Sequence, residues 1–357
     1  MDVSIVTSGH DVADARLHRE VAALVKAGLT IEVRGLGDPT DGPAGAAVRA
    51  RKRAGGVRRA WRALTWPWHA KGRVLVALDP DSAVGAWLFT ACHPRSRRFV
   101  ADVHEDYGLL LRDRDWARGV RGWSGRIWAR LGRLAARGAD RLVVADEHLM
   151  AEVTDRIVMR NLPDASMLPE PGDRGPVPRA LYVGDLRRSR GLFAMLDAIR
   201  DAPGWELDLV GPIAGGDRAE AVARLADPVL ADRVRWHGLL PPRESWELAR
   251  GAWVGLLLLE HTPAFREAIP SKLYEYLTCG LAVITTDLPR SAELVAESGA
   301  GIVVLDVSQA SAALRSWTAD PSRLDALRVA ARVWSETPRP EPTEEFVSAV
   351  RALALDS

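Results

Sequence analysis

Two glutamates and a lysine stand close together in the segment EAIPSKLYEYLTCGLAVITTD, residues 267–287. Carboxylates accept charge-assisted hydrogen bonds, so Glu267 and Glu275 could hold a sugar hydroxyl and a ribose diol. A helix that begins near residue 271 presents free N–H groups and its positive dipole end, which suit a diphosphate, and Lys272 adds a mobile cation there. The segment therefore predicts a site for a sugar nucleotide.

Local sequence signals predict the elements that position these groups. Ser271, after Pro270, is predicted to be the N-cap of a helix whose apolar residues repeat at helical spacing, and Gly280 is predicted to end it. The AVITT that follows is typical of a buried parallel strand. Glu267 then falls in the loop before the helix and Glu275 one turn inside it. An ordinary surface helix with scattered charges is the alternative interpretation.

The fixed offsets within this segment resemble the donor-site signature of family 4 glycosyltransferases, which have the GT-B fold. The matching features are Glu267, seven intervening residues, Glu275, a glycine five residues later and an apolar strand that ends in Thr-Asp. The variant PSKLYEY resembles a subgroup that often makes bacterial cell-surface polysaccharides. The resemblance implies that Glu267 contacts hydroxyls of the transferred sugar, Glu275 the ribose and Lys272 the diphosphate.

The composition is typical of a soluble globular protein with two domains, because 47% of the 357 residues are hydrophobic and 27% are charged. A net charge of +1 gives no general attraction to nucleic acid. Cys92 and Cys279 lack metal-ligand spacing, and Asp79-Pro80-Asp81 is explained by turn chemistry, so we expect no metal. The longest apolar runs fall short of the roughly 18 residues that a membrane span needs. We therefore expect a cytoplasmic protein.

Strand and helix patterns alternate through the first half of the chain, which predicts a Rossmann-like domain. The Gly9-His10 turn follows the first predicted strand, VSIVT, at the edge where open parallel sheets bind ligands. The surrounding TSGHDVADARLHRE resembles the opening of the same glycosyltransferase subgroup, which implies that the Gly9 backbone lies near the donor phosphates. Asp14 and Arg16 are explained nearly as well by a cap and an ion pair at a helix start.

His104 offers a titratable imidazole just past the predicted strand RFVADV at 98–103. The segment ADVHE resembles the glycosyltransferase family, in which a histidine at about this place reaches the transferred sugar or its phosphate. A structural histidine is the alternative interpretation, and Glu105 and Asp106 could equally cap the segment that follows.

Two stretches, 57–73 and 116–141, are rich in arginine and tryptophan. One helical face of the second stretch carries large apolar residues: Trp116, Val120, Trp123, Ile127, Leu131 and Leu134. The flank of that face carries four arginines: Arg126, Arg130, Arg133 and Arg137. This pattern predicts a peripheral surface for anionic lipid head groups. The alternatives are nucleic-acid binding, for which no recognition module is present, and a helix that merely packs on the sheet.

A second cycle of strands and helices follows the Pro- and Gly-rich segment 168–178, which is predicted to be the interdomain linker. In RALYVGDLRRSRG, the backbone amides after Gly184 and the guanidinium of Arg190 are predicted to bind a diphosphate. The family has a similar loop that ends in a basic residue and glycine. Many members, however, carry arginine where this chain has Asp185, and the candidates to replace that arginine are Arg187 and Arg188.

The resemblance extends over almost the whole chain and implies a GT-B fold, an α/β architecture of two Rossmann-like domains facing a central cleft. The N-terminal, acceptor-side domain is predicted at 1–170 and the nucleotide-sugar-binding domain at 171–335. A terminal crossover helix at 336–357 is predicted to pack back on the first domain. Within the second domain, HGLLPP resembles the segment that lines the nucleotide base pocket, which implies backbone contacts at Gly238 and Leu239.

The resemblance, together with these features, implies a retaining glycosyltransferase (EC 2.4) of hexosyltransferase type in cell-surface polysaccharide or glycolipid biosynthesis. Its donor is a nucleoside diphosphate sugar, its acceptor a glycan, a lipid-linked molecule or a small molecule, and no cofactor is expected. The predicted catalytic residues are Glu267, His104, Arg190 and Lys272. The predicted donor-binding residues are Gly9, Gly184, Arg187, Arg190, Gly238, Leu239, Lys272 and Glu275. The protein is expected in the cytoplasm, with peripheral contact at the inner face of the plasma membrane through 57–73 and 116–141.

Two other functions are compatible with the same sequence features. A sugar-nucleotide epimerase or hydrolase of the same architecture would use the same donor pocket, and only its products distinguish it. A non-catalytic protein would bind lipid or another transferase through the basic tryptophan-rich stretches. An oxidoreductase is not expected, because no G-x-G-x-x-G follows the first predicted strand.

Overall fold

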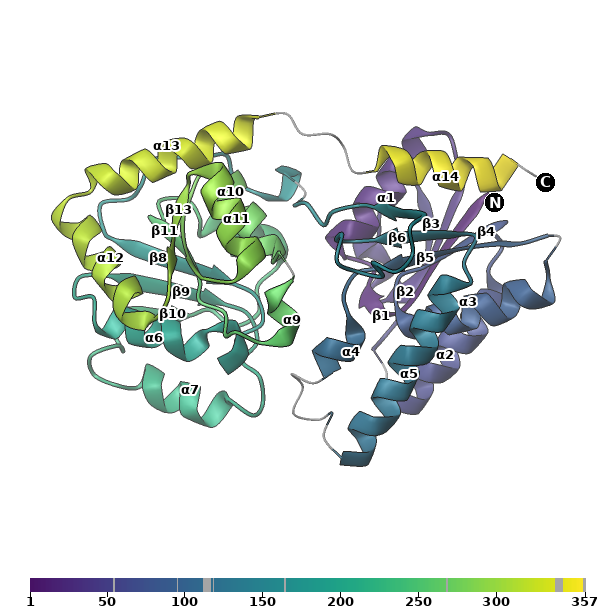
Figure 1. The fold of residues 1–357 in the computed structure, drawn as a ribbon, viewed down its shortest axis with the longest axis horizontal. Coiled ribbons are helices and arrows are strands. Elements are labelled where there is room, and N and C mark those ends of the chain that lie inside the picture. The colour runs from purple at the N-terminus through teal and green to yellow at the C-terminus, as the bar shows by residue number, and fades with distance from the viewer. Residues whose placement is uncertain are drawn as a thin grey trace. The chain divides into compact units, whose positions relative to one another are not determined.

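The computed structural model describes residues 1–53, 55–94, 96–111, 117, 119–163, 165–267, 269–337 and 343–355. The chain divides into two compact units, Met1–Asn161 with Pro340–Ser357, and Leu162–Arg339. Each unit is an α/β domain with one parallel sheet (Figure 1). Among the described helices, none has the length and apolarity that a membrane span requires.

The sheet of the first domain has seven described strands in the order β3-β2-β1-β4-β5-β6-β7, all parallel. Both faces of its central strands are covered by helices, so β4 is buried along its whole length and β1 along its first six residues. The strands are β1 (Val3–Asp11), β2 (Ile31–Leu36), β3 (Ala46–Arg51), β4 (Val74–Ala77), β5 (Arg98–Val103), β6 (Arg141–Val144) and β7 (Arg156–Val158).

Helices cover this sheet in two groups. On one face, α1 (Ala15–Lys26) and the C-terminal α14 (Glu344–Leu355) share a core with the strands. On the other face lie α2 (Gly56–His69), α3 (Pro80–Cys92) and α5 (Gly119–Arg137), with α3 and α5 contributing to a second core. The short elements are η1 (Pro39–Asp41) and α4 (Tyr107–Leu110).

The second domain has a six-stranded parallel sheet in the order β10-β9-β8-β11-β12-β13. Its strands are β8 (Arg179–Val183), β9 (Glu206–Val210), β10 (Val234–Trp236), β11 (Val254–Leu257), β12 (Ala282–Thr286) and β13 (Gly301–Val304). Its helices are η4 (Ala165–Met167), η5 (Arg188–Arg190), α6 (Leu192–Arg200), α7 (Arg218–Leu225), α8 (Pro242–Glu247), α9 (Pro263–Arg266), α10 (Ser271–Thr278), α11 (Pro289–Ser298), α12 (Val307–Ala319) and α13 (Ser322–Glu336). Two apolar cores, one on each face, fix these helices on the sheet.

The boundary between the domains lies earlier than the predicted residue 170. The second unit begins at Leu162, because Leu162 and Leu168 pack against the core of that unit. Most of the predicted linker, 168–178, is therefore the start of the second domain rather than a free connection. Its Pro and Gly content reflects an irregular path on the surface of that domain.

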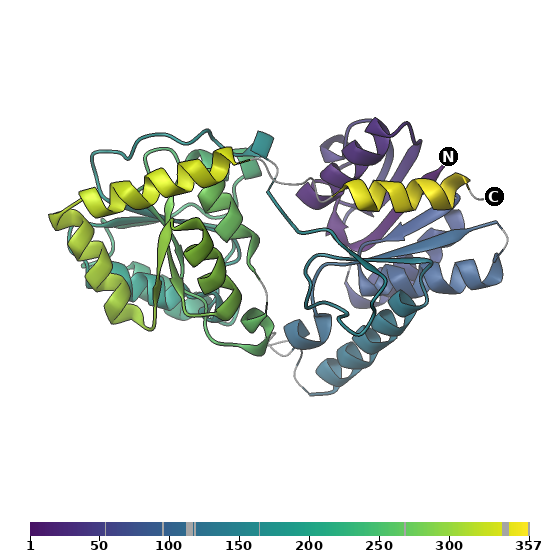
Figure 2. The ribbon, with the colours of Figure 1, turned by 45° about the horizontal axis from the view of Figure 1, so that its top comes forward.

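The C-terminal segment rejoins the first domain, as predicted (Figure 2). Phe346, Val350 and Ala354 of α14 are buried in the core that also contains α1 and β1. The predicted start at 336 is too early, since Glu336 is the last residue of α13. The proline-rich residues 338–342, between α13 and α14, lie outside the described residues.

Candidate functional site

In the second domain, the helix α10 begins at Ser271, but Ser271 is not its N-cap. Pro270 holds that position with φ −64° and ψ 133°, and no capping side chain accepts a hydrogen bond from the first turn. The prediction of a Ser271 cap is therefore wrong, because the fixed φ of proline already sets the extended backbone that the cap position needs. The helix ends as predicted: Gly280 follows it at φ +69°.

Lys272 lies directly across the backbone of Gly184, in the loop after β8. A Cβ atom built on Gly184 would stand 2.2 Å from Lys272 Cε and 2.7 Å from Nζ, so only glycine fits there. Gly184 also has φ +141°, which disfavours other residues. The Nζ atom stands 5.9 Å from the ring centroid of Tyr182. Two predicted donor-binding residues that are distant in sequence thus meet at one point.

The three arginines of the loop after β8 have different surroundings. Arg187 donates a hydrogen bond to the carboxylate of Asp185, so the acidic residue that departs from the family pattern neutralises it. Arg188 pairs with Glu220 on the surface. Arg190 is half-buried, and its guanidinium carbon lies 5.9 Å from the ring centroid of Phe265. Of these three, Arg190 is the arginine best placed to act together with Lys272.

Tyr182 shares this site and was not predicted. It is fully buried at the end of β8, and its hydroxyl donates to the backbone oxygen of Asp185 at 3.2 Å. Burial raises the pKa of Tyr182 to about 12, although the positive charge of Arg190 works in the opposite direction. The phenol therefore stays neutral, with its ring centroid 5.9 Å from Lys272 Nζ.

The remaining predicted donor-binding residues lie in the same domain and differ in how far their side chains are exposed to solvent. Glu275 is half-buried inside α10, whereas the Glu267 side chain is 56% exposed and stands 3.8 Å from Arg266. Gly238 accepts a 2.7 Å hydrogen bond from the backbone of Gly211, and Leu239 is 80% exposed. The exposed Glu267 and Leu239 are free of the core and available to a ligand.

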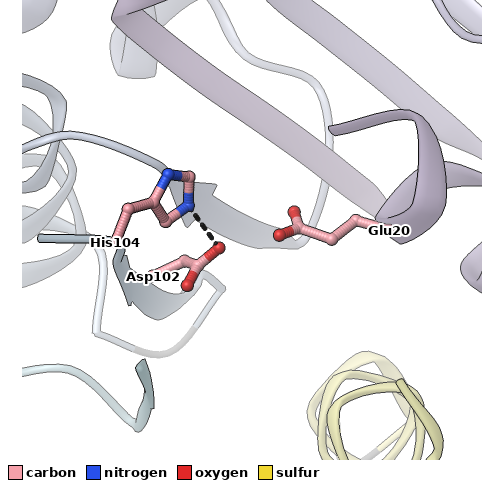
Figure 3. A group of neighbouring side chains, drawn as sticks. All are labelled: Glu20, Asp102 and His104. Carbon is pink, nitrogen blue, oxygen red and sulfur yellow. Dashed lines mark hydrogen bonds and ion pairs between the residues drawn. The ribbon is translucent and has the colours of Figure 1, made fainter. Parts of the chain in front are cut away.

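In the first domain, His104 is part of a buried chain of charged groups (Figure 3). Its Nε2 lies 2.8 Å from Asp102 Oδ2, and its ring meets the ring of His10 edge-on at 4.9 Å. Arg16 donates two hydrogen bonds to Asp102, of 2.8 and 2.6 Å, and a third to the backbone oxygen of Met159. The alternative interpretation of Arg16 as a helix-start ion pair captured only its 3.2 Å contact with Glu20.

The charges around His104 determine the protonation state of its imidazole. Burial opposes the charge on Asp102, but Arg16 and His104 outweigh that effect and hold the pKa of Asp102 well below its usual range. Burial, reinforced by the charge of Arg16, lowers the pKa of His104 despite the carboxylate. His104 is therefore neutral at pH 7, with Nε2–H donating to Asp102 and Nδ1 left as a hydrogen-bond acceptor.

Glu20 points toward Asp102 from α1 and is also fully buried (Figure 3). Burial and the adjacent negative charge of Asp102 raise the pKa of Glu20 well above its usual value. Ligand atoms of Glu20, Asp102 and His104 lie within 4.8 Å of one another, which resembles a metal site. The guanidinium of Arg16 already stands between both carboxylates, at 3.2 Å from Glu20, so the donor set does not favour a metal ion.

Gly9, the predicted phosphate contact, is held by Asp79 at the start of α3. Asp79 accepts hydrogen bonds from the backbone N–H of Ser8 at 2.8 Å and of Gly9 at 3.2 Å, and caps α3 through Ser82. This confirms the interpretation of Asp79 as turn and cap chemistry. The N–H of Gly9 is thus already engaged within its own domain. The guanidinium of Arg59 lies over Gly9 instead, with Nη2 only 3.0 Å from where a Cβ would be.

The two basic stretches form helices α2 and α5, and both present large apolar side chains to solvent. Trp61 is 69% exposed on α2, and Trp123 is 62% exposed on α5. The rest of the predicted apolar face of α5 is exposed too, at Ile127, Leu131 and Leu134. The glycines at 119, 122 and 125 do not prevent this helix. Trp116 and the side chain of Val120 lie outside the described residues.

Comparisons with known proteins agree with this architecture. Residues 169–334 match the family model of the glycosyl transferases group 1. That span is the second domain, where Lys272 and Gly184 meet. No protein with a curated description matches the chain.

Several solved structures share the fold over nearly the whole chain. Sucrose-phosphate synthase from Thermosynechococcus elongatus matches at 17% identity and a TM-score of 0.73, over 100% of this chain and 97% of that one. Anabaena HepE, solved with UDP and glucose, matches at 14% identity and a TM-score of 0.68, over 99% and 98%. The lipopolysaccharide outer core galactosyltransferase WaaB matches at 13% identity and a TM-score of 0.61, over 99% of both chains. The fold of this chain is GT-B, as predicted.

Proposed function

We propose that this protein is a retaining glycosyltransferase that moves a hexose from a nucleoside diphosphate sugar to an acceptor hydroxyl. The observation that carries the proposal is the position of Lys272 across Gly184, at the open N-terminus of α10 and beside the loop of Arg190. Two cations and free helix N–H groups are the chemistry that a diphosphate requires. The group 1 match over the same domain and the UDP and UDP-glucose named for HepE support it.

In the proposed reaction, the acceptor oxygen bonds to the anomeric carbon while the bond from that carbon to the phosphate oxygen breaks. The departing phosphate keeps the electron pair of the broken bond and takes the proton of the acceptor hydroxyl on the same face. Lys272, Arg190 and the N–H groups of α10 would stabilise the charge that develops on the leaving diphosphate. Glu267 and the neutral His104 would orient hydroxyls of the transferred sugar. No metal takes part in this proposal.

Glu275 would bind the ribose diol, and the backbone at Gly238 and Leu239 would border the base. The exposed tryptophans and arginines of α2 and α5 would hold the protein against anionic lipid. We propose that the activity lies in the cytoplasm, at the inner face of the plasma membrane. Polysaccharide or glycolipid biosynthesis is the pathway class that fits this location, and the lipopolysaccharide role named for WaaB is consistent with it.

Product analysis tests the proposal against its rivals. The purified protein is incubated with UDP-glucose and other nucleoside diphosphate sugars, with and without a panel of hydroxyl-bearing acceptors, and products are identified by mass spectrometry and NMR. A new glycoside whose anomeric configuration equals that of the donor is expected. A changed nucleotide sugar would indicate an epimerase, and free sugar alone a hydrolase. Donor binding without any product would favour a non-catalytic protein.

A further inference from the structure

A cavity of about 270 Å³ lies within the first domain, between α3, α5 and the segment after β5. Ala77 at the end of β4 pairs in register with Ala101 of β5, so the carboxyl ends of two neighbouring strands form its floor. Ligands of open parallel sheets bind at this edge. Asp102, which holds His104, also lines the cavity. The cavity therefore borders the predicted sugar-orienting histidine.

Small and apolar side chains make most of the inner wall. They come from both helices and from the turn after β6: Ala83, Ala129, Ala136, Leu149 and Met150. Gly132 lets α5 approach α3 closely, because a Cβ there would meet Pro80 Cβ at 2.4 Å. A sugar would leave such a wall without hydrogen bonds for its hydroxyls, whereas an apolar group fits it.

Three arginines of α5 line the same cavity, and two of them are uncommitted. Arg133 is bound to Glu152 at 2.7 Å and stands 3.9 Å from Asp106. Arg126 and Arg130 have no ion pair or hydrogen bond within the part of the chain that the structure describes. Arg126 is half-buried and Arg130 exposed. Two positive charges thus stand at the edge of an apolar space without a counter-ion in the described residues.

The acidic residues of the cavity do not neutralise these arginines, since most are held elsewhere. Asp102 is bound by Arg16, and Asp79 by the loop after β1 and by Ser82. Asp106 caps α4 through the N–H of Leu109. Glu105 is exposed and is the one lining carboxylate without a hydrogen bond or ion pair among the described residues. The excess charge beside the apolar wall is positive.

We propose that this cavity binds the acceptor of the transfer reaction, and that the acceptor carries an apolar group next to a phosphate or other anionic group. The apolar part would fill the alanine-lined space, and Arg126 and Arg130 would bind the anion, since arginine offers planar paired donors to phosphate. A lipid-linked phosphate and a soluble anionic amphiphile share this chemistry. The acceptor role rests on the proposed function, whereas the binding site itself does not.

The test measures binding of octyl phosphate by isothermal titration, below its micelle concentration and without donor. Octyl glucoside supplies the same chain without the charge, and inorganic phosphate supplies the charge without the chain. We expect octyl phosphate to bind at least tenfold more tightly than either. Equal binding of octyl glucoside, or no binding of octyl phosphate, would overturn the proposal.

Variants locate the binding. Ala129→Phe fills the cavity, and the double variant Arg126→Glu with Arg130→Glu reverses its charge. Each variant is expected to bind octyl phosphate at least tenfold more weakly than the wild type. Arg323→Glu, an exposed charge reversal on α13 of the second domain, should change the affinity less than twofold. Unchanged affinity in both cavity variants would sink the idea. A thermal melt of every variant verifies folding, and the charge reversal serves if Ala129→Phe does not fold.

Two further experiments ask whether the acceptor is a membrane lipid and whether the cavity binds the acceptor during the reaction. The first experiment measures how strongly each protein binds vesicles of phosphatidic acid in phosphatidylcholine. If the acceptor is a lipid, Ala129→Phe should bind the vesicles more weakly than wild type. If the acceptor is soluble, the two proteins should bind them equally. Once product analysis identifies an acceptor, Ala129→Phe must raise its KM at least tenfold and leave the donor KM within twofold; an unchanged acceptor KM contradicts the acceptor role. Octyl phosphate binding without any response to nucleotides would contradict the proposed function alone.

Discussion

The two domains build their candidate sites in different ways. In the second domain, the groups that would bind a diphosphate come from two short loops and one helix start, and Gly184 and Lys272 meet because neighbouring parallel strands end together. In the first domain, His104 depends on buried charges that arrive from distant positions, such as Arg16, 86 residues before Asp102. The first kind of site follows from local patterns, whereas the second follows from burial and from long-range pairing.

The largest effect should come from removing Asp102. Asp102→Ala leaves the guanidinium of Arg16 buried without its carboxylate, which typically costs about 3–5 kcal/mol of unfolding free energy. For a domain of this size that lowers the melting temperature by roughly 6–20 °C. Scanning calorimetry, which resolves the transitions of separate domains, should show the shift in the first domain only. Glu247→Ala removes the exposed Arg250 pair and should cost less than about 1 kcal/mol; an equal loss in both variants would refute the comparison.

Lys272→Ala should affect function and spare stability. Loss of one preorganised cation at the leaving group is expected to reduce the transfer rate by about 10²–10³-fold. Steady-state kinetics with the donor found by product analysis measure this loss. Lys52→Ala, on the surface of the first domain, is the matched control and should transfer at the wild-type rate. If Lys272→Ala keeps that rate too, the donor site has been placed wrongly.

Glu20→Gln should change how the stability of the first domain depends on pH. Because the folded pKa of Glu20 is raised, the folded state holds a proton that the unfolded state loses, so wild-type stability falls as pH rises above about 4.5. Each unit of raised pKa corresponds to about 1.4 kcal/mol. The glutamine variant lacks this proton and should show a flatter profile in melts between pH 5 and 8, and greater stability at pH 8. A parallel fall in both proteins would mean that Glu20 is charged in the folded state.

The smallest effect on the fold is expected at the exposed tryptophans of α2 and α5. Trp61→Ala with Trp123→Ala should alter the melting temperature by no more than about 1–2 °C, because both side chains already face solvent. Sedimentation with vesicles of anionic lipid should nevertheless show binding weakened by roughly tenfold or more. Val329→Ala, which changes an exposed apolar residue on α13 of the second domain, is the control. If this double variant bound vesicles as strongly as wild type, α2 and α5 would serve only to pack against the sheet and not to contact lipid.

Sequence reasoning succeeded where the structure is set by local periodicity and turn residues. The strands at 98–103 and 282–286, the end of α10 at Gly280 and the return of α14 to the first domain were predictable for this reason. It missed β3, whose residues alternate between partly buried and exposed at a sheet edge, and β7, which has three residues. Neither carries a continuous apolar run.

The buried chain of Arg16, Asp102 and Glu20 was not predictable from the sequence. Asp102 lies inside the buried strand β5, where the hydrophobic pattern predicts an apolar residue. Its ion-pair partner, Arg16, comes from α1, far away in the sequence. The domain boundary was predicted at 170 and lies at 161 for a related reason, since proline and glycine content marks irregular backbone and not the place where cores separate. Asp185 pairs with Arg187, so whether Arg187 or Arg188 replaces the arginine that the resemblance leads one to expect stays a prediction.

The most direct measurement is thermal stabilisation of the purified protein by a panel of nucleoside diphosphates and their sugars, each with magnesium and with EDTA. A ligand that binds only the folded state must raise the melting temperature. The expected result is a shift with one nucleoside diphosphate that persists in EDTA and is lost in Glu275→Ala but kept in Glu293→Ala, an exposed carboxylate on α11. No shift with any nucleotide would contradict a donor site at Gly184 and Lys272.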